Sequence, residues 1–539
     1  MQQLLDFIIV GSGFGGSVSA LRLTEKGYSV AVIEQGKRWA KEDFAETNWD
    51  LRKFIWRPGL GLHGILQMTV TSDVFFLHGA GVGGGSLVYA NTLIEPPAQA
   101  FDDPQWIGGR WQVDLAPYYT LAKRMLGAVV SPVIVHTDRV LKEVAEEMGR
   151  GDTFHAHDVG VYFGEPGITK ADPFFDGKGP ERTGCTLCGG CMVGCRVGAK
   201  NTLDQNYLYL AEKLGAMIVP EIKVIDIVPL GEGDPRSAPI DARANGSNGY
   251  ELTIEKSMGL LKSRERVRTR GVVLSAGSFG TVDLLFRCKD RGTLPNVSDK
   301  LGDFVRTNSE ALVGVVSKDK NVDYSKGIAI TSGAFVDDST HVEIVRYPAG
   351  SDAMALLTTP LTDDGPEMSR PVRWLKAIFA NPGQAIRALA PFGWAKRTAI
   401  LLVMQPVNNY LRYRLTRSWW WPFRKTLDTA LVGGQKVPVY LPQANNVARR
   451  MAEKMNAVPQ SGILEVLFGK ATTAHILGGC PIGATEETGV VDPDHKLFGY
   501  ENFYVADGSV IPANLGVNPS LTITAMSERA MAKVPGKEL

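Results

Sequence analysis

The chain has few cysteines and no long hydrophobic run. Six cysteines in 539 residues cannot form the dense disulfide framework of a small secreted protein, and four of them are crowded into eleven residues. No run reaches the roughly 18–20 apolar residues that a membrane-spanning helix needs. The N-terminal residues also lack the basic and apolar regions of a secretory signal. We therefore expect a cytoplasmic protein whose membrane contact, if any, is peripheral and on the inner face of the membrane.

An excess of charge of either sign is also missing. The 58 basic and 57 acidic residues leave a formal charge of +1, which gives no reason to expect nucleic acid as a partner. Hydrophobic residues make up 44% and charged residues 21%, close to ordinary globular usage. A chain of this length is too long for one simple core. We expect two domains, or one large fold built around a cleft.

A glycine-rich turn follows the first apolar segment. Residues 7–10 form a short run that predicts a buried parallel strand, and residues 11–16 read Gly-Ser-Gly-Phe-Gly-Gly. Gly11 permits a tight turn, Gly13 lets the backbone approach a pyrophosphate, and Gly16 lets the next helix pack close to the strand. The order of these residues predicts a dinucleotide-binding turn.

The segments after this turn complete the pattern. We expect a helix over residues 17–26, whose N-terminal amides face the phosphates, and a second strand over residues 29–33. Glu34 follows that strand, where a carboxylate can hold the ribose of an adenosine that carries no 2′-phosphate. The pattern predicts a Rossmann-like domain and leaves FAD and NAD as alternatives.

Further segments carry a family resemblance. A second glycine run occupies residues 79–86, Asp507-Gly508 follows a predicted strand, and residues 516–520 read Gly-Val-Asn-Pro-Ser. Together with the first glycine turn, they resemble the glucose-methanol-choline (GMC) family of FAD oxidoreductases. Residues 185–201 and 347–350 resemble its cholesterol-oxidase-like branch.

The resemblance implies a fold class and a division into domains. The expected fold is α/β, with a discontinuous Rossmann-like FAD-binding domain and an inserted α+β substrate-binding domain built on an antiparallel sheet. The FAD-binding domain is expected to comprise residues 1–100, 200–305 and 472–539, and the substrate-binding domain residues 101–199 and 306–471.

The same resemblance implies how FAD is bound. Some members tether the flavin to a histidine after the second glycine run, but residues 87–91 contain none, so we expect non-covalent FAD. Glu34 would bind the adenosine ribose, Asp507 would lie beside the ribityl chain, and the backbone of Val224 would contact adenine. The expected FAD-binding residues are Gly11, Gly13, Phe14, Gly15, Gly16, Glu34, Gly81, Gly83, Gly84, Gly85, Ser86, Asn91, Val224, Ala276, Gly277, Asp507, Gly508, Asn518 and Pro519.

Oxidation of an alcohol needs a base that accepts the hydroxyl proton while hydride leaves the carbon, and histidine suits that task. Among eight histidines, His475 lies in a segment that resembles the family's active site, with Asn518 as its expected partner. Cholesterol oxidases also isomerise a double bond with a carboxylate. Asp352 stands where they carry glutamate, and Glu310 and Glu343 are alternatives.

The cysteine run has the spacing of a ligand set. Cys185, Cys188, Cys191 and Cys195 are spaced as in a bacterial ferredoxin run, which favours a [4Fe-4S] cluster. In ferredoxins the fourth cysteine ligates a different cluster, so Cys288 or Cys480 is an alternative fourth ligand. Zinc and reduced thiols that shape a turn are alternatives. A cluster would pass electrons to a redox carrier, whereas a flavin alone would pass them to oxygen.

One segment is basic and aromatic. Residues 370–427 contain eleven lysines and arginines and no acidic residue, together with Trp374, Trp394, Trp419, Trp420 and Trp421. Tryptophan prefers the membrane interface and cations are drawn to anionic lipid, so this segment predicts a membrane-docking surface. A dimer interface, or core aromatics with solvated cations, is the alternative.

We expect FAD-dependent oxidation of a 3β-hydroxysteroid or a similar bulky hydrophobic alcohol, with possible double-bond isomerisation. One alternative is a flavin and iron-sulfur dehydrogenase of long-chain or terpenoid alcohols. Another is a membrane-surface electron-transfer flavoprotein that binds no alcohol.

Overall fold

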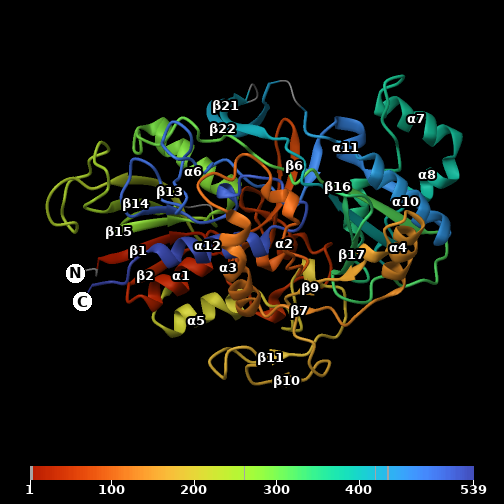
Figure 1. Ribbon diagram of the computed structural model, residues 1–539, viewed down its shortest axis with the longest axis horizontal. Helices are drawn as coiled ribbons and strands as arrows, with labels where there is room; N and C mark the ends of the chain where they lie inside the picture. The colour runs from red at the N-terminus through yellow and green to blue at the C-terminus, as the bar shows by residue number, and fades with distance from the viewer. Residues whose placement is uncertain (1–3, 260–261, 419–420, 434–435, 539) are drawn as a thin grey trace.

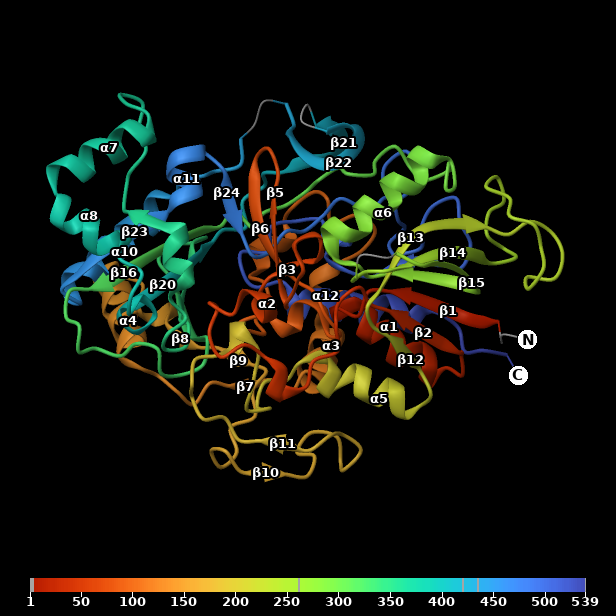
Figure 2. The ribbon, with the colours of Figure 1, turned by 180° about the vertical axis from the view of Figure 1, so that it is seen from behind.

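The computed structural model describes residues 4–259, 262–418, 421–433 and 436–538. Two seven-stranded sheets dominate the architecture. They lie along the long axis of the molecule, with both termini at one end and helices α7 (Arg370–Ala380) and α8 (Pro382–Leu389) at the other (Figure 1, Figure 2). No helix among the described residues has the length and apolarity needed to cross a bilayer.

The first sheet is built on a parallel core. Short β-branched and aromatic segments pair in the order β12-β2-β1-β15, and β25 pairs in parallel with the end of β15. Two more strands extend β15 as an antiparallel meander. The strands are β1 (Leu5–Val10), β2 (Val30–Ile33), β12 (Met217–Val219), β13 (Ile222–Pro229), β14 (Tyr250–Lys256), β15 (Arg264–Leu274) and β25 (Phe503–Val505).

Helices bury this sheet. The apolar side chains of α1, α3, α5 and α12 join those of β1, β2 and β15 in one hydrophobic cluster. Helix α6 packs on β13. Strands covered in this way read as continuous apolar runs, as residues 7–10 do. The helices are α1 (Phe14–Glu25), α3 (Trp111–Met125), α5 (Tyr207–Lys213), α6 (Gly277–Arg291) and α12 (Ser520–Lys533).

Helix α1 begins earlier than the sequence predicts. It starts at Phe14, directly after Gly13, whereas the apolar spacing placed its start at residue 17. An added Cβ on Gly16 would lie 2.0 Å from the carbonyl oxygen of Gly11. The third glycine of the turn therefore lies inside the helix and lets it pack against the preceding turn, as predicted.

The second sheet is antiparallel throughout. Its order is β19-β23-β16-β20-β18-β17-β8. The strands are β8 (His155–Ala156), β16 (Ala311–Ser317), β17 (Ile330–Phe335), β18 (His341–Val345), β19 (Thr358–Pro360), β20 (Thr398–Met404) and β23 (Ala457–Gly462).

The two faces of this sheet serve different purposes. Because side chains alternate along a strand, Ala399, Leu401 and Val403 pack with helices α4 (His136–Glu147) and α10 (Pro442–Lys454). Ile400 and Leu402 point to the opposite face, which lines a large cavity. The antiparallel sheet therefore forms one wall of the candidate site.

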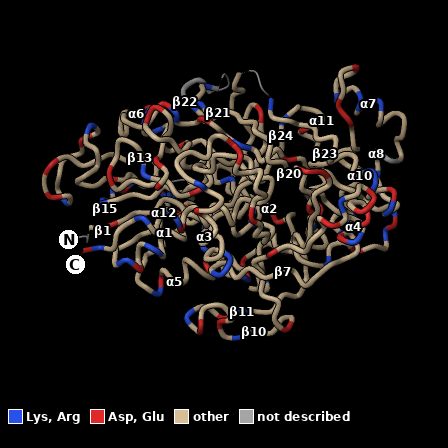
Figure 3. Tube along the Cα trace, viewed as in Figure 1, with Lys and Arg blue, Asp and Glu red and all other residues tan. Residues whose placement is uncertain are grey.

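A small three-stranded sheet joins the two halves. Strand β24 (Ala471–Thr473) pairs with β6 (Val74–Gly79), which also pairs with β5 (Leu66–Val70). β24 leads directly into His475, and β6 leads into the second glycine run. Charged residues lie mostly toward the outside of the trace, and its central part is largely uncharged (Figure 3).

Candidate active site

A single cavity of about 980 Å³ runs between the two sheets. At one end it is lined by the first glycine turn, by Glu34 and by residues 222–225 of β13. At the other end its walls are apolar and include Met192, Tyr347 and Trp394. His475 and Asn518 also line it. The cavity therefore combines a polar nucleotide-like end with a hydrophobic end of the kind that holds small apolar ligands.

The carboxylate of Glu34 connects the two glycine runs. The Ser12 amide and hydroxyl donate to its Oε2 at 3.1 and 2.7 Å. The amides of Gly36 and Gly81 donate to its Oε1 at 2.8 and 3.4 Å. Burial raises the pKa of Glu34, and these hydrogen bonds oppose the rise because they favour the charged form.

The two runs approach each other backbone to backbone. Gly84 has φ +52°, and a Cβ added there would lie 2.6 Å from the Cα of Gly13. A Cβ added to Gly15 would lie 1.5 Å from the carbonyl oxygen of Ala506, next to Asp507. The cradle is therefore open only because these positions carry no side chain.

Most of the predicted FAD-binding residues line this cavity. They are Gly11, Gly13, Phe14, Gly15, Glu34, Gly84, Gly85, Val224, Ala276, Gly277, Asp507, Gly508, Asn518 and Pro519. Their contiguous arrangement fits an extended dinucleotide, with backbone amides near one end and a buried carboxylate at the end of β2. The donor chemistry and shape of the cradle thus fit FAD.

Five predicted residues lie behind the cavity wall instead. Gly16 packs against the turn, and Gly81 binds Glu34. The Ser86 hydroxyl donates to the carbonyl oxygen of Gly83 at 2.7 Å. Asn91 is fully buried beside Cys191. None of these residues is among the described residues that line the cavity, and Gly81 and Ser86 make hydrogen bonds within the protein instead.

His475 is paired with a buried carboxylate. Its Nδ1 contacts Oε1 of Glu310, whose Oε2 accepts the Ala474 amide at 2.8 Å. Glu310 has a fully buried side chain, and that of His475 is 13% exposed. With Nδ1 held by Glu310, Nε2 is the ring nitrogen that lies beside Asn518, and both side chains line the cavity.

Asn518 lies on the other side of the imidazole. Its Nδ2 is 3.4 Å from the His475 Nε2 and donates to Oε2 of Glu343 at 3.3 Å. Its Oδ1 is buried and has no hydrogen-bond partner among the described residues. An asparagine so held has one oxygen free to accept a hydrogen bond from a ligand hydroxyl.

The second histidine of the cavity differs from His475. His78 also lines it, and its ring nitrogen contacts the Thr69 hydroxyl at 3.0 Å. Burial lowers the pKa of His78 to about 4, because the charged form loses hydration. His78 therefore stays neutral near pH 7, and it has no carboxylate partner among the described residues comparable to Glu310.

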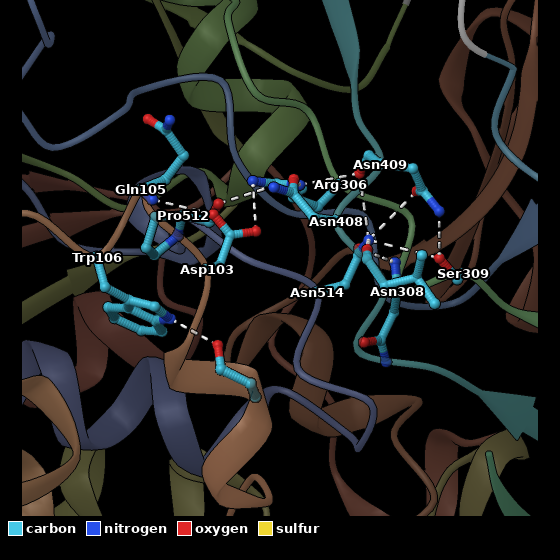
Figure 4. A network of polar contacts seen from close by, with 12 residues as sticks. Asp103, Gln105, Trp106, Arg306, Asn308, Ser309, Asn408, Asn409, Pro512 and Asn514 are labelled. Atoms are coloured by element: carbon cyan, nitrogen blue, oxygen red, sulfur yellow. Dashed lines mark hydrogen bonds and ion pairs between the residues drawn. The ribbon is translucent and has the colours of Figure 1, made fainter. Parts of the chain in front are cut away.

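A buried polar network connects the segment before Glu310 with the segment before Asn518 (Figure 4). Arg306, which is fully buried, forms an ion pair with Asp103 at 2.9 Å and donates to the Pro512 carbonyl at 2.9 Å. Asn308 donates to the Val517 carbonyl at 3.0 Å and accepts the Gly516 amide at 2.8 Å. The segment before Glu310 is thereby fastened to the segment before Asn518.

Sequence reasoning missed this network. Arg306 and Asn308 belong to no motif, and their partners lie about two hundred residues away along the chain. The only available signal was the asparagine-rich composition of residues 408–409 and 514–518. Such residues are as often turn formers as network members.

The three predicted carboxylate bases do not line the described part of the cavity. Asp352 accepts the amides of Gly393 and Ala395 at 3.0 and 2.8 Å, so its carboxylate caps the start of α9 (Trp394–Arg397). Glu310 and Glu343 lie behind His475 and Asn518. Glu310 and Glu343 are thus positioned to orient His475 and Asn518, whereas Asp352 is bound to the start of α9.

The four clustered cysteines surround one small cavity. Cys185, Cys188, Cys191 and Cys195 all line it. The other two cysteines lie elsewhere. Cys288 is in α6, and the backbone amide of Cys480 donates to the Ser509 carbonyl oxygen. All six are free thiols. The run therefore brings its own four sulfurs together without Cys288 or Cys480.

The sequence of this chain is similar to family models and to known proteins. Residues 423–527 match the family model described as GMC oxidoreductase, and residues 9–40 match a NAD(P)-binding Rossmann-like domain. The chain is 47% identical to a cholesterol oxidase of Acinetobacter baumannii over 99% of this chain and 94% of that protein. It is 46% identical to a cholesterol oxidase of Mycobacterium tuberculosis over 99% of this chain and 91% of that protein.

More distant relatives share the overall fold. A long-chain-alcohol oxidase of Arabidopsis thaliana is 24% identical over 98% of this chain and 67% of that protein. The crystal structure of a pyridoxine 4-oxidase superposes with a TM-score of 0.60 at 14% identity, covering 98% of this chain and 99% of the other. These similarities confirm the predicted fold class.

Replacing Glu34 tests the cradle. We expect Glu34→Ala to weaken FAD binding at least about tenfold, because each hydrogen bond to a carboxylate contributes roughly 1.5–3 kcal/mol. Flavin absorbance per chain after gel filtration, and titration of the apoprotein with FAD, measure the loss. Glu42→Ala, at an exposed site, is the matched control. Equal FAD affinity in the two variants would contradict the role of Glu34.

Proposed function

The chain belongs to the GMC oxidoreductase family, in its cholesterol-oxidase-like branch, and from that membership we propose that it oxidises the 3β-hydroxyl group of a sterol to a ketone. It is an FAD-dependent alcohol oxidoreductase. The single observation that carries the substrate proposal is the His475–Glu310 pair beside Asn518, at the junction of the nucleotide cradle and the apolar end of the cavity.

The shape and lining of the apolar end support a sterol. Its walls are contributed by Met192, Tyr347, Met354, Trp394 and Leu402, and most of these side chains are apolar and buried. A flat, rigid hydrocarbon gains free energy from burial against such walls, roughly 25 cal/mol for each Å² removed from water. The only polar groups needed there are those that meet a single hydroxyl.

Residues of this chain handle the proton. Nε2 of His475 accepts the proton of the substrate hydroxyl, and Glu310 stabilises the resulting imidazolium through Nδ1. The hydroxyl donates its single hydrogen to Nε2, and Asn518, whose Nδ2 lies 3.4 Å from that nitrogen, borders the position of the substrate oxygen. Bound FAD supplies the acceptor for the hydride that leaves the carbon.

We limit the proposal to oxidation. Double-bond isomerisation needs a carboxylate that faces the steroid rings, and none of Asp352, Glu310 and Glu343 lines the described part of the cavity. The long-chain alternative stays weaker, since the long-chain-alcohol oxidases are 23–24% identical to this chain. An electron-transfer flavoprotein that binds no alcohol would not need the base that the His475–Glu310 pair supplies.

Substitution of His475 tests the mechanism. We expect His475→Ala to lower kcat for cholesterol by roughly 10²–10⁴-fold with full FAD content, because general-base catalysis contributes that much. Glu310→Gln should lower kcat by a smaller factor with little change in KM, since the base stays present without its partner charge. His136→Ala, at an exposed histidine, is the control.

Unchanged turnover in His475→Ala would contradict the assignment and favour the electron-transfer alternative. Loss of FAD in both variants would indicate a structural role instead. Steady-state kinetics together with the flavin spectrum of each variant distinguish these outcomes.

We further propose that the four clustered cysteines hold a [4Fe-4S] cluster. Its support is that all four cysteines line one small cavity and that their sequence spacing is that of a bacterial ferredoxin run. The amides of Leu187 and Lys200 donate to Cys185 and Cys195 sulfurs at 3.4 Å, as is common for cluster ligands.

The charges around this cavity also support an anionic group. Lys200 and Arg182 are buried, and neither forms an ion pair with a carboxylate among the described residues. Their head groups donate to backbone carbonyls instead. Met192, next to Cys191, lines the main cavity. A cluster here would supply one-electron transfer to a carrier, and oxygen is the acceptor that the flavin would use without it.

Iron and sulfide analysis tests the cluster. Protein prepared without oxygen should contain about four iron and four acid-labile sulfide ions per chain, and Cys195→Ala should contain far less of both. Cys288→Ala is the matched control, because that thiol lies outside the run. A yellow wild-type protein that holds no sulfide under these conditions would contradict the proposal.

We also propose that helices α7 and α8 dock on an anionic membrane. Trp374 is half-buried and Trp394 is buried, so these tryptophans do not form an exposed belt; Trp419, Trp420 and the side chain of Trp421 lie outside the described residues. The exposed apolar side chains are instead Val372, Leu375, Phe379, Ile386, Leu389 and Phe392, which are 42–84% exposed. Lysines and arginines accompany them without any acidic residue.

The position of this surface suits a membrane-borne substrate. Helix α8 packs on β19 and β23, and its Ala388 carbonyl accepts a hydrogen bond from Gln460, which lines the cavity. Exposed apolar side chains beside cations are the features of an interfacial surface. A sterol could pass from the lipid into the cavity along this route.

Vesicle binding tests the surface. Phe379→Ser with Phe392→Ser should weaken binding to phosphatidylglycerol vesicles at least about tenfold, because each aromatic ring loses roughly 1.5–3 kcal/mol of burial. Leu60→Ser, at an equally exposed leucine elsewhere, is the control. The double variant could instead bind vesicles as the wild type does and differ from it in molar mass by light scattering. That result would identify an interface between copies of the chain.

A further inference from the structure

Three histidines converge at one end of the antiparallel sheet. His155, His157 and His341 each offer a ring nitrogen, and these atoms lie within 4.8 Å of one another. No other such group of potential metal ligands occurs in the part of the chain that the structure describes. His155 is exposed, and the other two are fully buried.

The register of the strands explains why they meet. β17 lies between β8 and β18, and Gly333 of β17 pairs with His155 on one side and with Glu343 on the other. Side chains two residues apart on a strand share a face. His155 and His157 therefore project to the same side of the sheet as His341 and Glu343.

Gly333 leaves the space that these side chains occupy. A Cβ added there would lie 2.7 Å from Nε2 of His157 and 2.7 Å from Nε2 of His341. Any other residue at this position would displace the rings. The room that the two buried rings occupy is thus provided by the missing side chain of Gly333.

The buried donors lack hydrogen-bond partners. Both ring nitrogens of His157 and of His341, and Oε1 of Glu343, have none among the described residues. Oε1 of Glu343 lies 3.5 Å from Nε2 of His157 and 3.8 Å from Nδ1 of His341. Buried polar atoms are nearly always paired, so unpaired ring nitrogens of two buried histidines beside an unpaired carboxylate oxygen point to a ligand.

From this geometry we propose that His155, His157, His341 and Glu343 bind one Zn²⁺ ion. Three imidazoles and one carboxylate form a closed four-coordinate set of the type that zinc prefers. Among the described residues, none of these four lines the substrate cavity or the small cavity of the cysteines. Binding of the ion does not depend on the proposed reaction, whereas its effect on Asn518 rests on that reaction.

The site also reaches the catalytic residues. Oε2 of Glu343, the oxygen that faces away from the histidines, accepts the Nδ2 hydrogen of Asn518. A metal on Oε1 would hold this carboxylate charged and in one orientation, and so would fix Asn518 beside His475. Glu343 is then a positioning residue that acts through Asn518, which explains why a carboxylate so deeply buried is present.

Cobalt titration tests the site directly. Chelator-treated holoenzyme should bind one equivalent of Co²⁺ with the visible absorption of a four-coordinate ion, and Zn²⁺ should displace it. His155→Ala removes an exposed ligand with little risk to folding, and should weaken binding at least about tenfold. His136→Ala, an exposed histidine on α4, is the control and should bind as the wild type does.

Two further measurements keep the proposal falsifiable. Zn²⁺ should raise the thermal midpoint of the wild type and of His136→Ala, and should raise that of His155→Ala less. Chelation of the wild type should lower kcat by a larger factor than it changes KM, because Asn518 loses its fixed orientation. Absence of stoichiometric Co²⁺ binding by the wild type, or equal affinity in His155→Ala and His136→Ala, would overturn the assignment.

Discussion

The close approach of the two glycine runs is the constraint on which the rest of the structure depends. Glu34 accepts hydrogen bonds from Ser12 in the first run and Gly81 in the second, and Gly84 lies against Gly13 with no room for a side chain. The nucleotide cradle exists only while these backbones stay together. The cavity, the position of β6 and the path of the chain toward the cysteine run all follow from this contact.

The catalytic end is assembled from segments that are distant in sequence. Strand β24 brings His475 to the cavity, β16 begins directly after Glu310, and α12 begins directly after Asn518 and Pro519. Arg306 and Asn308 fasten these segments to one another. His475, Glu310 and Asn518 are thus supported by a network whose residues are not among the described residues that line the cavity. Such support from behind holds side chains in a fixed geometry.

Local signals made part of this structure predictable. The glycine turn, Glu34 and His475 carry information within a few residues, so the sequence singled out residues that the structure places in one cavity. The pairing of His475 with Glu310 depends on tertiary packing, and Glu310 was expected only as a spare carboxylate. Asp352 was expected as a base because of its position in a segment that resembles the family. Its two carboxylate oxygens instead accept hydrogen bonds from two backbone amides. The His155–His341 group needs strand register, which no single segment reveals.

The central claim is that a sterol alcohol reduces the flavin of this chain. An anaerobic titration of the holoenzyme with cholesterol, followed by flavin absorbance, tests it most directly. We predict complete bleaching by about one equivalent of cholesterol, with the matching ketone as product, and no bleaching by the analogue that lacks the 3β-hydroxyl. Flavin that stays oxidised with cholesterol, but bleaches with a long-chain or terpenoid alcohol, would contradict the account.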